Sequence, residues 1–464
     1  MEKMLNMDEL IVVELEGDTL TPISIFQRIS GKKKFLLESS LKHEKTGRYS
    51  FIGAEPALEL KGYGEKTEIV KGKTRKIKDE KPLEVLKAFL PNKDQTVKDI
   101  PFIGGAVGYV AYDAIRQYER IGEELDDDLQ VPDVHLMFFE EVIVYDHLEQ
   151  KVFIIGTPIQ PETTSEQFRK KVLKRKEEVL NGSDITPVIK ASISSFKASM
   201  KKEDFIEKVK IAKNYILEGD IFQVVLSQRL EAAIEGDPFS FYRKLRIDNP
   251  SPYMYYLDFE DYAVAGASPE SIVKKVQTKI TTNPIAGTRP RGKSEEEDKS
   301  LEKELMEDEK ELAEHRMLVD LGRNDLGRVC EFGSIQLEKY MEIEKYKHVM
   351  HLVSEVCGTL KKQFTPVDAL ISCLPAGTVS GAPKIRAMEI INELEEIKRG
   401  VYSGAIGYFS ANGNMDFALA IRTMLVKNNK AYIQAGAGIV HDSIPEKEYE
   451  ETLHKLRAFL EDQK

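Results

Sequence analysis

Two pairs of glutamates have a spacing that suits a metal site. Glu311 and Glu314 lie three residues apart in KELAEH, and Glu448 and Glu451 have the same separation in EKEYEETLHK. Residues three apart on a helix project from one face. Four carboxylates from two helices facing one cavity would suit a hard cation such as Mg²⁺, which takes few protein oxygens and keeps several waters. Because 31% of the chain is charged, the alternative that both pairs are solvated helix faces stays open.

Three glycine-rich segments offer backbone N–H groups to an anion. They are PIAGTRPRG at 284–292, PAGTVSGAPK at 375–384 and QAGAGIV at 434–440. None of them matches a Walker A loop or a GxGxxG dinucleotide fingerprint. Arg422, which we expect in a strand containing AIRT, adds a guanidinium that could clamp a carboxylate. The segments are consistent with an anion site and equally with ordinary turns.

Two further side chains are candidates for proton transfer. Glu270 ends the strand-like run AGASPE, where a buried carboxyl could act as an acid or a base. His351 lies among apolar residues in HVMHLVS, which we interpret as a helix with His348 on the same face. A core histidine that only satisfies its hydrogen bonds would look the same. No GxSxG or GxCxG nucleophile elbow is present, and the three cysteines lie in segments typical of buried positions.

The composition restricts the classes of partner. The 464 residues carry a formal net charge of −11, and this acidic balance argues against nucleic acid or an anionic membrane as the main partner. Three cysteines without CxxC spacing indicate a reducing compartment. The charged N-terminus lacks the apolar stretch of a signal peptide, and no apolar run is long enough to span a bilayer. We expect a soluble, cytoplasmic protein.

The elements that must position these residues predict an α+β fold, with helices outside antiparallel or mixed sheets. Strands are expected at 35–40, 49–63, 136–146, 221–230, 253–259 and 263–270, and an antiparallel meander at 403–440. Helices are expected at 203–218, at 294–319 and after Pro445. The composition shifts after residue 160, so we predict an N-terminal domain at 1–160, a connecting segment at 161–200 and a catalytic domain at 201–464.

Taken together, a series of segments resembles the chorismate-utilising enzymes, and within them the anthranilate synthase component I branch. The matching segments are GDIFQVVLSQR, GASPE, PIAGTRPRG, EKELAEHRMLVDLGRNDLGRV, YKHVMHLVSEV, PAGTVSGAPK, AIRTM, GAGIV and EYEET. The resemblance covers essentially the whole chain. It implies two facing β-sheets with helices outside, a chorismate-binding domain in 201–464, and an N-terminal half that completes the sandwich.

The resemblance also implies roles for individual residues. Glu314 and Glu451 would bind Mg²⁺ directly, with Glu311 and Glu448 beside them or bridging through water. The residues expected to contact chorismate are Gly287, Thr288, Tyr402, Arg422, Gly436, Ala437 and Gly438. Glu270 would act as acid or base at the ring, while His351 and Thr378 would position or protonate the departing hydroxyl.

Two positions indicate which nucleophile is used. Relatives that add water to chorismate carry a lysine base at the place of Gln223, and many aminodeoxychorismate synthases carry a nucleophilic lysine at the place of Ala286. Their absence implies direct attack by ammonia, giving anthranilate and pyruvate. Aminodeoxychorismate synthase component I stays open as the closest alternative, and a non-catalytic amino-acid sensor as a rival from another class. Since no glutaminase nucleophile is evident, the resemblance implies a glutamine amidotransferase subunit as partner in a hetero-oligomer.

The resemblance further implies a tryptophan feedback site. Glu38 and Ser39 in LLESS, with Pro252, Tyr253 and Met254 in NPSPYMYY, would line it. On pattern alone the first segment is a strand edge and the second a turn into a strand. Related aminodeoxychorismate synthases can hold tryptophan as a structural ligand, so the motif by itself does not establish feedback inhibition.

Overall fold

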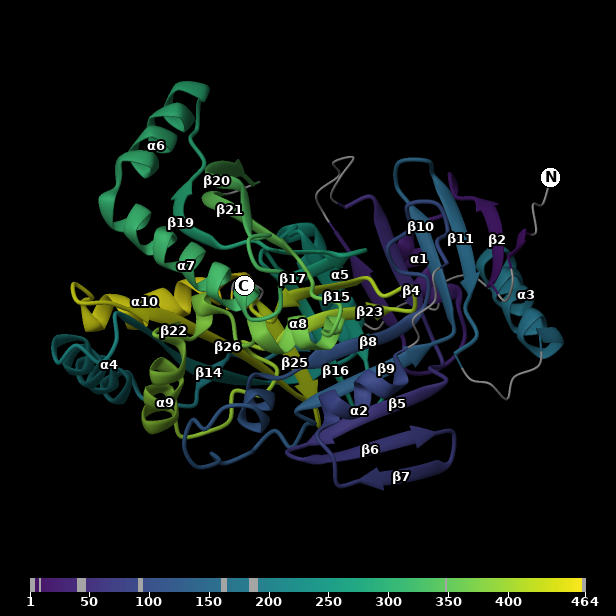
Figure 1. The fold of residues 1–464 in the computed structure, drawn as a ribbon, viewed down its shortest axis with the longest axis horizontal. Coiled ribbons are helices and arrows are strands. Elements are labelled where there is room, and N and C mark those ends of the chain that lie inside the picture. Colours follow the sequence, from purple (N-terminus) through teal and green to yellow (C-terminus); the bar gives the residue numbers. More distant parts are fainter. Residues whose placement is uncertain are drawn as a thin grey trace.

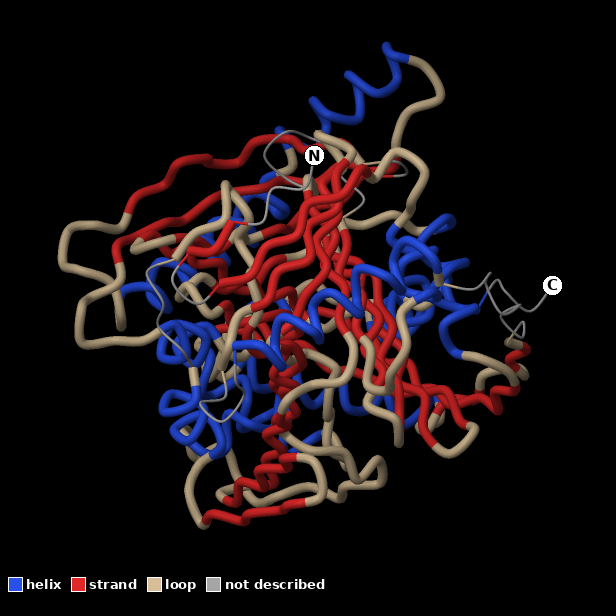
Figure 2. Tube along the Cα trace, turned by 90° about the vertical axis from the view of Figure 1, so that its right-hand side faces the viewer, coloured by secondary structure: helices blue, strands red, loops and turns tan. Residues whose placement is uncertain are grey.

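The structure is a computed structural model that describes residues 5–7, 10–39, 47–90, 95–159, 165–182, 191–346 and 349–460. Strands run through the middle of the molecule and helices lie outside them (Figures 1 and 2). The predicted α+β fold is confirmed: the strands form two large sheets whose neighbouring strands pair antiparallel. Within the described ranges, no helix has the length and apolar character needed to cross a membrane.

Each sheet takes strands from both halves of the chain. The first sheet has the order β1 (Leu5–Met7), β2 (Leu10–Glu16), β11 (Lys151–Gly156), β10 (Glu141–Asp146), β4 (Tyr49–Gly53), β3 (Phe35–Glu38), β15 (Tyr253–Asp258), β16 (Tyr262–Ser268), β25 (Thr423–Lys427), β26 (Lys430–Ile439), β14 (Gln223–Glu235) and β12 (Ser192–Ile193), with β13 (Lys197–Ala198) and β22 (Gly381–Ala382) also paired to β14. The second has the order β19 (Ile285–Pro290), β21 (Val349–Thr359), β18 (Lys279–Thr282), β17 (Ser271–Val276), β24 (Met415–Leu419), β23 (Ala405–Ser410), β8 (Gly105–Val110), β9 (Val134–Phe139), β5 (Leu58–Tyr63), β6 (Lys66–Lys71) and β7 (Thr74–Lys78), with β20 (Gln336–Lys345) paired to β21.

Helices cover the outer faces of both sheets (Figure 1). They are α1 (Pro22–Arg28), α2 (Pro82–Phe89), α3 (Ser165–Asn181), α4 (Lys202–Leu217), α5 (Pro238–Asp248), α6 (Glu295–Glu307), α7 (Glu309–Gly327), α8 (Pro366–Cys373), α9 (Lys384–Leu394), α10 (Pro445–Lys455) and α11 (Arg457–Leu460), with 3₁₀ turns η1 (Tyr112–Gln117) and η2 (Gly377–Val379). Between the sheets, one apolar cluster joins Val144 and Leu257 of the first sheet to Val107 and Ile406 of the second. The inner faces therefore pack as a sandwich.

The chain crosses between the two sheets several times, and two adjacent crossings, residues 269–270 and 420–422, are called the seam here. The first links β16 to β17, and the second links β24 to β25. The two passages are hydrogen-bonded to each other, since Leu419 N donates to Glu270 O at 2.9 Å and Ala267 N donates to Arg422 O at 3.1 Å. Arg422 has a φ of +48°, a left-handed conformation that is uncommon for residues other than glycine.

The seam corrects the predicted meander at 403–440. The structure has two hairpins in different sheets, β23–β24 and β25–β26, and Arg422 lies between strands rather than within one. The run DFALAIRTMLV gave no sign of the break because Ala420 and Ile421 continue its apolar pattern into the passage between the sheets.

Two helix predictions are also corrected. The helix expected at 294–319 is two helices, because Asp308 accepts hydrogen bonds from the backbone N–H groups of Lys310 and Glu311 and so begins a new helix. The segment around His351 is strand β21, not a helix, and His348 lies outside the described residues. Alternating β-branched residues at Val349 and Val353 are typical of a strand. The domain boundary near residue 160 stays a prediction.

A buried ion pair joins several elements near the seam. The Arg399 guanidinium donates to the Glu395 carboxylate at 2.8 and 2.6 Å, and to the carbonyl oxygens of Val379 and Val225 at 2.7 Å each. It also lies 5.7 Å from the centre of the Tyr402 ring. Arg399 is only 2% exposed, so these contacts are shielded from water. The pair fixes η2, β14 and Tyr402 relative to one another.

A protein without Arg399 should therefore unfold more easily. We expect Arg399→Met to lower the free energy of unfolding by about 3–5 kcal/mol, because the Glu395 carboxylate would be left buried without its partner. Arg328→Met is the matched control: Arg328 faces Glu119 at 3.5 Å on the surface, and such pairs contribute about 0–1 kcal/mol. Urea denaturation measures the free energy of unfolding of both variants. Equal losses in the two variants would contradict the conclusion that the buried Arg399–Glu395 pair stabilises the fold.

Candidate active site

Glu270 and Thr378 form a buried hydrogen bond at the seam. Glu270 follows β16 and Thr378 lies in η2, and the Thr378 hydroxyl donates to Glu270 Oε1 at 2.7 Å. Burial raises the pKa of the Glu270 carboxyl to about 7, while the Thr378 hydrogen bond and the charges of Lys455 and Arg422 lower it. A carboxyl that titrates near pH 7 can both give and accept a proton under ordinary conditions.

The guanidinium of Arg422 lies close enough to Glu270 for each charge to affect the other's pKa. Burial lowers the pKa of Arg422, and the Glu270 charge raises it. In the part of the chain that the structure describes, no side chain or carbonyl forms a hydrogen bond or ion pair with this guanidinium. A half-buried cation without a partner is costly, so the arrangement favours an anionic ligand.

His351 lies on β21 opposite the bulged strand β19. Its Nδ1 is 3.0 Å from the Thr288 hydroxyl and 3.1 Å from the carbonyl oxygen of Gly287. Because a carbonyl only accepts, Nδ1 carries the proton in the Gly287 contact and Nε2 is left with its lone pair. Burial lowers the pKa of His351, while the Gly287 hydrogen bond raises it. Gly287 has a φ of +69°, and a Cβ there would lie 3.3 Å from Glu311 Oε2.

Strand β26 brings the predicted glycines to the same region. A Cβ at Gly436 would lie 2.9 Å from the Tyr402 hydroxyl, and one at Gly438 would lie 2.6 Å from Gln223 Nε2. Both positions thus need glycine because a side chain would displace neighbouring groups. Ala437 between them is fully buried.

Lys455, at the end of α10, was not predicted but belongs to this group. Its ammonium donates to the Gly436 carbonyl oxygen at 2.9 Å and pairs with Glu451 at 2.7 Å. Its charge also lowers the pKa of Glu270 and of Glu448. The available signal was its position four residues after Glu451 in EYEETLHK, which places both on one helix face.

The four candidate metal ligands lie on α7 and α10, which run near each other in Figure 1. Glu314 Oε1 accepts from the Gln223 amide at 3.1 Å. Burial raises the pKa of Glu311, and the charge of the neighbouring Glu314 raises it further. Burial also raises the pKa of Glu448; the hydrogen bond from Ser443 lowers it, and the charge of Glu451 raises it. Among the described residues, no three His, Cys, Asp or Glu side chains converge as a metal set. The half-buried carboxylate oxygens nevertheless have the chemistry that fits a hard cation.

The predicted tryptophan-site residues also come together. Glu38 of β3 is the register partner of Met254 in β15, so LLESS and PSPYM are neighbouring segments. The Glu38 carboxylate accepts from the Tyr242 hydroxyl at 2.7 Å and from Arg246 at 2.8 and 3.1 Å. The Tyr253 hydroxyl donates to Asp416 at 3.0 Å. Ser39 and Pro252, at the strand ends, are partly exposed.

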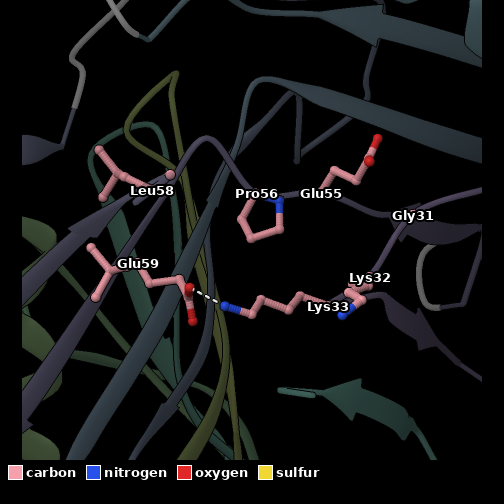
Figure 3. A pocket seen from close by; sticks show the side chains of 9 residues that line it. Gly31, Lys32, Lys33, Glu55, Pro56, Leu58 and Glu59 are labelled. Atoms are coloured by element: carbon pink, nitrogen blue, oxygen red, sulfur yellow. Dashed lines mark hydrogen bonds and ion pairs between the residues drawn. The ribbon is translucent and has the colours of Figure 1, made fainter. Parts of the chain in front are cut away.

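Of two hollows in the structure, one is lined by candidate site residues and the other is not. The larger, about 370 Å³, lies between the segment at Gly31–Lys33 and the start of β5, and contains none of the candidate residues. Figure 3 shows Lys33 reaching across it to the Glu59 carboxylate. The smaller, about 30 Å³, is lined by Glu270 and Thr378. The lysines of the larger hollow already pair with glutamates, so neither its lining nor its charges connect it with the candidate residues.

Comparison with known proteins shows the family of the chain. Residues 32–461 match the family described as chorismate binding enzyme. The chain is 48% identical to anthranilate synthase component 1 of Acetivibrio thermocellus, over 97% of this chain and 94% of that protein. It is 44% identical to the Lactococcus lactis protein of the same name, over 97% and 98%. The crystal structure of anthranilate synthase component I from Streptococcus pneumoniae superposes with a TM-score of 0.83 at 44% identity, covering 96% and 98% of the two chains. The chain therefore belongs to the chorismate binding enzyme family and, within it, to the anthranilate synthase component 1 group.

Proposed function

We propose that this chain converts chorismate and ammonia to anthranilate and pyruvate, in a Mg²⁺-dependent step of tryptophan biosynthesis. The observation that carries the proposal is the Glu270–Thr378 hydrogen bond beside the Arg422 guanidinium, which forms no hydrogen bond or ion pair with any described residue. A proton-transfer group next to a fixed positive charge suits a dianionic ring substrate. The full-length similarity to anthranilate synthase component 1 proteins supports the choice of reaction.

Arg422, Lys455 and the backbone of β26 would hold the two carboxylates of chorismate. A guanidinium can bind a carboxylate through two parallel hydrogen bonds, which fixes orientation as well as charge. Gly287, Thr288 and Tyr402 would complete the contacts. The left-handed backbone at Gly287 and Arg422 supports this assignment, since such conformations are frequent at ligand sites.

Glu270 would serve in both stages of the reaction. In the first, the nitrogen lone pair of ammonia forms a bond to ring C2, the ring double bond shifts, and the C4–O bond breaks; the Glu270 carboxyl protonates the departing hydroxyl, which leaves as water. In the second, the resulting carboxylate accepts the proton from C2, the C3–O bond breaks, and the enolate of pyruvate leaves as the ring becomes aromatic. The added nitrogen, an ammonium after the first stage, gives up one proton, and the enolate takes up one proton to become pyruvate. The pKa of about 7 for Glu270 supports use in both protonation states.

His351 and Thr378 would orient the groups around C4. Thr378 keeps the Glu270 carboxyl in place by its 2.7 Å hydrogen bond. Because burial lowers the pKa of His351, its ring is neutral at pH 7, and Nε2 would accept a hydrogen bond from the C4 hydroxyl and so position it for protonation by Glu270.

Glu314 and Glu451 would bind Mg²⁺, with Glu311 and Glu448 beside them. When bound, the cation would neutralise a substrate carboxylate. Gln223 would orient Glu314 through its 3.1 Å hydrogen bond. Lys455, paired with Glu451 at 2.7 Å, would exchange that carboxylate for a carboxylate of the substrate.

A glutamine amidotransferase subunit, component 2, would supply the ammonia. This chain's own cysteines do not suit glutamine hydrolysis: all three are buried, and burial raises the pKa of Cys373 to about 12 and of Cys330 to about 11. A thiol with a high pKa is a poor nucleophile. Tryptophan would bind near Glu38, Ser39, Pro252, Tyr253 and Met254 and inhibit the reaction.

The proposal predicts the products of the isolated chain. With chorismate, Mg²⁺ and ammonium at alkaline pH, we expect anthranilate and pyruvate in equal amounts, measured by anthranilate fluorescence and a coupled pyruvate assay. Chelation of the metal should stop the reaction and added Mg²⁺ should restore it. Tryptophan should inhibit it.

An aminated, non-aromatic product without pyruvate would contradict the proposal and favour an aminodeoxychorismate synthase. Tryptophan binding without any turnover would instead favour the amino-acid sensor.

Glu270 and Thr378 can be tested separately. We expect Glu270→Gln to abolish anthranilate formation, because the amide neither gives nor accepts the proton. Thr378→Val should keep activity but move the apparent pKa of the pH–rate profile upward, because the hydrogen bond from Thr378 lowers the pKa of Glu270. The sign follows from the loss of a donor that favours the charged carboxylate.

Thr365→Val provides the control, since Thr365 only caps α8. A Thr378→Val profile that coincides with that of the control would argue against Glu270 as the titrating group.

A further inference from the structure

His315 of α7 is a buried histidine that takes no part in the proposed binding of chorismate. It directly follows Glu314 along the helix and is fully buried. Its Nε2 lies 2.7 Å from the hydroxyl oxygen of Ser354 in β21, while its Nδ1 forms no hydrogen bond with any residue that the structure describes. One hydrogen bond, to Ser354, therefore joins this side chain to the rest of the described chain.

The Ser354 hydroxyl also holds strand β20. Met341 N donates to Ser354 Oγ at 2.9 Å. This bond depends on a bulge, since the register of β20 against β21 shifts between Lys339 and Glu342, and Met341 has a φ of +55°. A bulge takes a residue out of the strand ladder, so the Met341 N–H is available to a side chain. The Ser354 N–H donates to the carbonyl oxygen of Pro284, between β18 and β19, at 3.1 Å. Ser354 thus connects α7 to two further segments of the second sheet.

Strand β21 places Ser354 and His351 on opposite faces. Successive side chains of a strand alternate between its faces, and these two residues are separated by an odd number of positions. His351 contacts β19 through Thr288, whereas Ser354 contacts α7. Leu352, on the same face as Ser354, packs in an apolar cluster with Leu312 of α7. One strand therefore supports both a residue of the proposed ring site and the helix that carries two candidate metal ligands.

Those two candidate ligands lie between two points at which α7 is anchored. At the start of the helix, the Arg289 guanidinium donates to the Asp308 carboxylate at 2.7 Å. Further along, His315 is bonded to β21, and Glu311 and Glu314 lie between these points. Mg²⁺ demands a near-ideal octahedron of oxygens at about 2.0–2.1 Å. A small displacement of α7 would therefore change how well both carboxylates fit the ion.

We propose that His315 is a positioning residue for the Mg²⁺ site. Through its bond to Ser354 it fixes α7 at the place from which Glu311 and Glu314 reach the cation. His315 acts through the helix and contacts neither the ion nor chorismate. The inference rests on the proposed function, in which these two carboxylates hold Mg²⁺. Because β21 also carries His351, the same bond keeps the metal ligands aligned with the ring site.

Mg²⁺ binding to the intact chain tests the proposal without relying on turnover. His315→Phe keeps a flat ring and loses the hydrogen bond. We expect it to raise the Mg²⁺ dissociation constant about 10–100-fold, the usual effect of removing a group that orients a metal ligand. His315→Gln returns a hydrogen-bonding group at a similar reach and should restore most of the affinity. Isothermal titration calorimetry measures the dissociation constant, and the thermal midpoint reports the stability of each variant.

Ser354→Ala breaks the same bond from the side of β21. It should also weaken Mg²⁺ binding, and the double variant with His315→Phe should bind about as weakly as His315→Phe alone, because both changes remove one shared bond. Ser372→Ala is the matched control: Ser372 is a buried serine of α8 whose hydroxyl donates to the Ala369 carbonyl oxygen at 2.9 Å. Its loss should leave the Mg²⁺ affinity at the wild-type value.

Weaker Mg²⁺ binding in folded His315→Phe or Ser354→Ala, with Ser372→Ala like the wild type, supports the assignment. A lower thermal midpoint with an unchanged dissociation constant overturns it, because His315 would then only stabilise the fold. Effects of the two changes that add fully in the double variant overturn it as well. Equal Mg²⁺ binding by the wild type and the variants removes this inference alone, whereas a wild-type chain that binds no Mg²⁺ removes the metal site of the proposed function and this inference with it.

Discussion

The site depends on one constraint, which is that two adjacent passages between the sheets place a buried carboxyl near a half-buried guanidinium. Glu270 lies on the passage from β16 to β17, and Arg422 on the passage from β24 to β25. The backbone hydrogen bonds Leu419 N–Glu270 O and Ala267 N–Arg422 O hold the two passages together. These bonds hold the backbone of both residues in place, so both side chains extend from fixed positions before any ligand binds.

Burial at the seam has opposite consequences for the two groups. It raises the pKa of Glu270 to about 7 and so makes the carboxyl useful as an acid. It lowers the pKa of Arg422, but a guanidinium stays charged. The free-energy cost of removing this charge from water is relieved when an anion binds. The Arg399–Glu395 pair supports the arrangement from behind, because it holds η2, which carries Thr378, against β14.

Much of the site could be predicted because its residues lie in segments with a specific order. Glu270, Thr378 and the β26 glycines were identified from such segments, and the structure brings them together. The seam could not be predicted, since the apolar residues before and after Arg422 continue the strand pattern. The role of Asp308 as a helix start was hidden among the other charges of 294–319. Lys455 was missed because a lysine at a helix end is usually solvated, and only the fold brings it to Gly436.

The claim that the seam is the substrate site can be tested most directly by a crystal structure with an unreactive analogue that keeps the ring carboxylate of chorismate. The account predicts a carboxylate within hydrogen-bond distance of the Arg422 guanidinium, at about 3 Å, with the ring between Arg422 and the Glu270 carboxyl. An analogue bound elsewhere, with Arg422 still unpaired at the seam, would contradict the account.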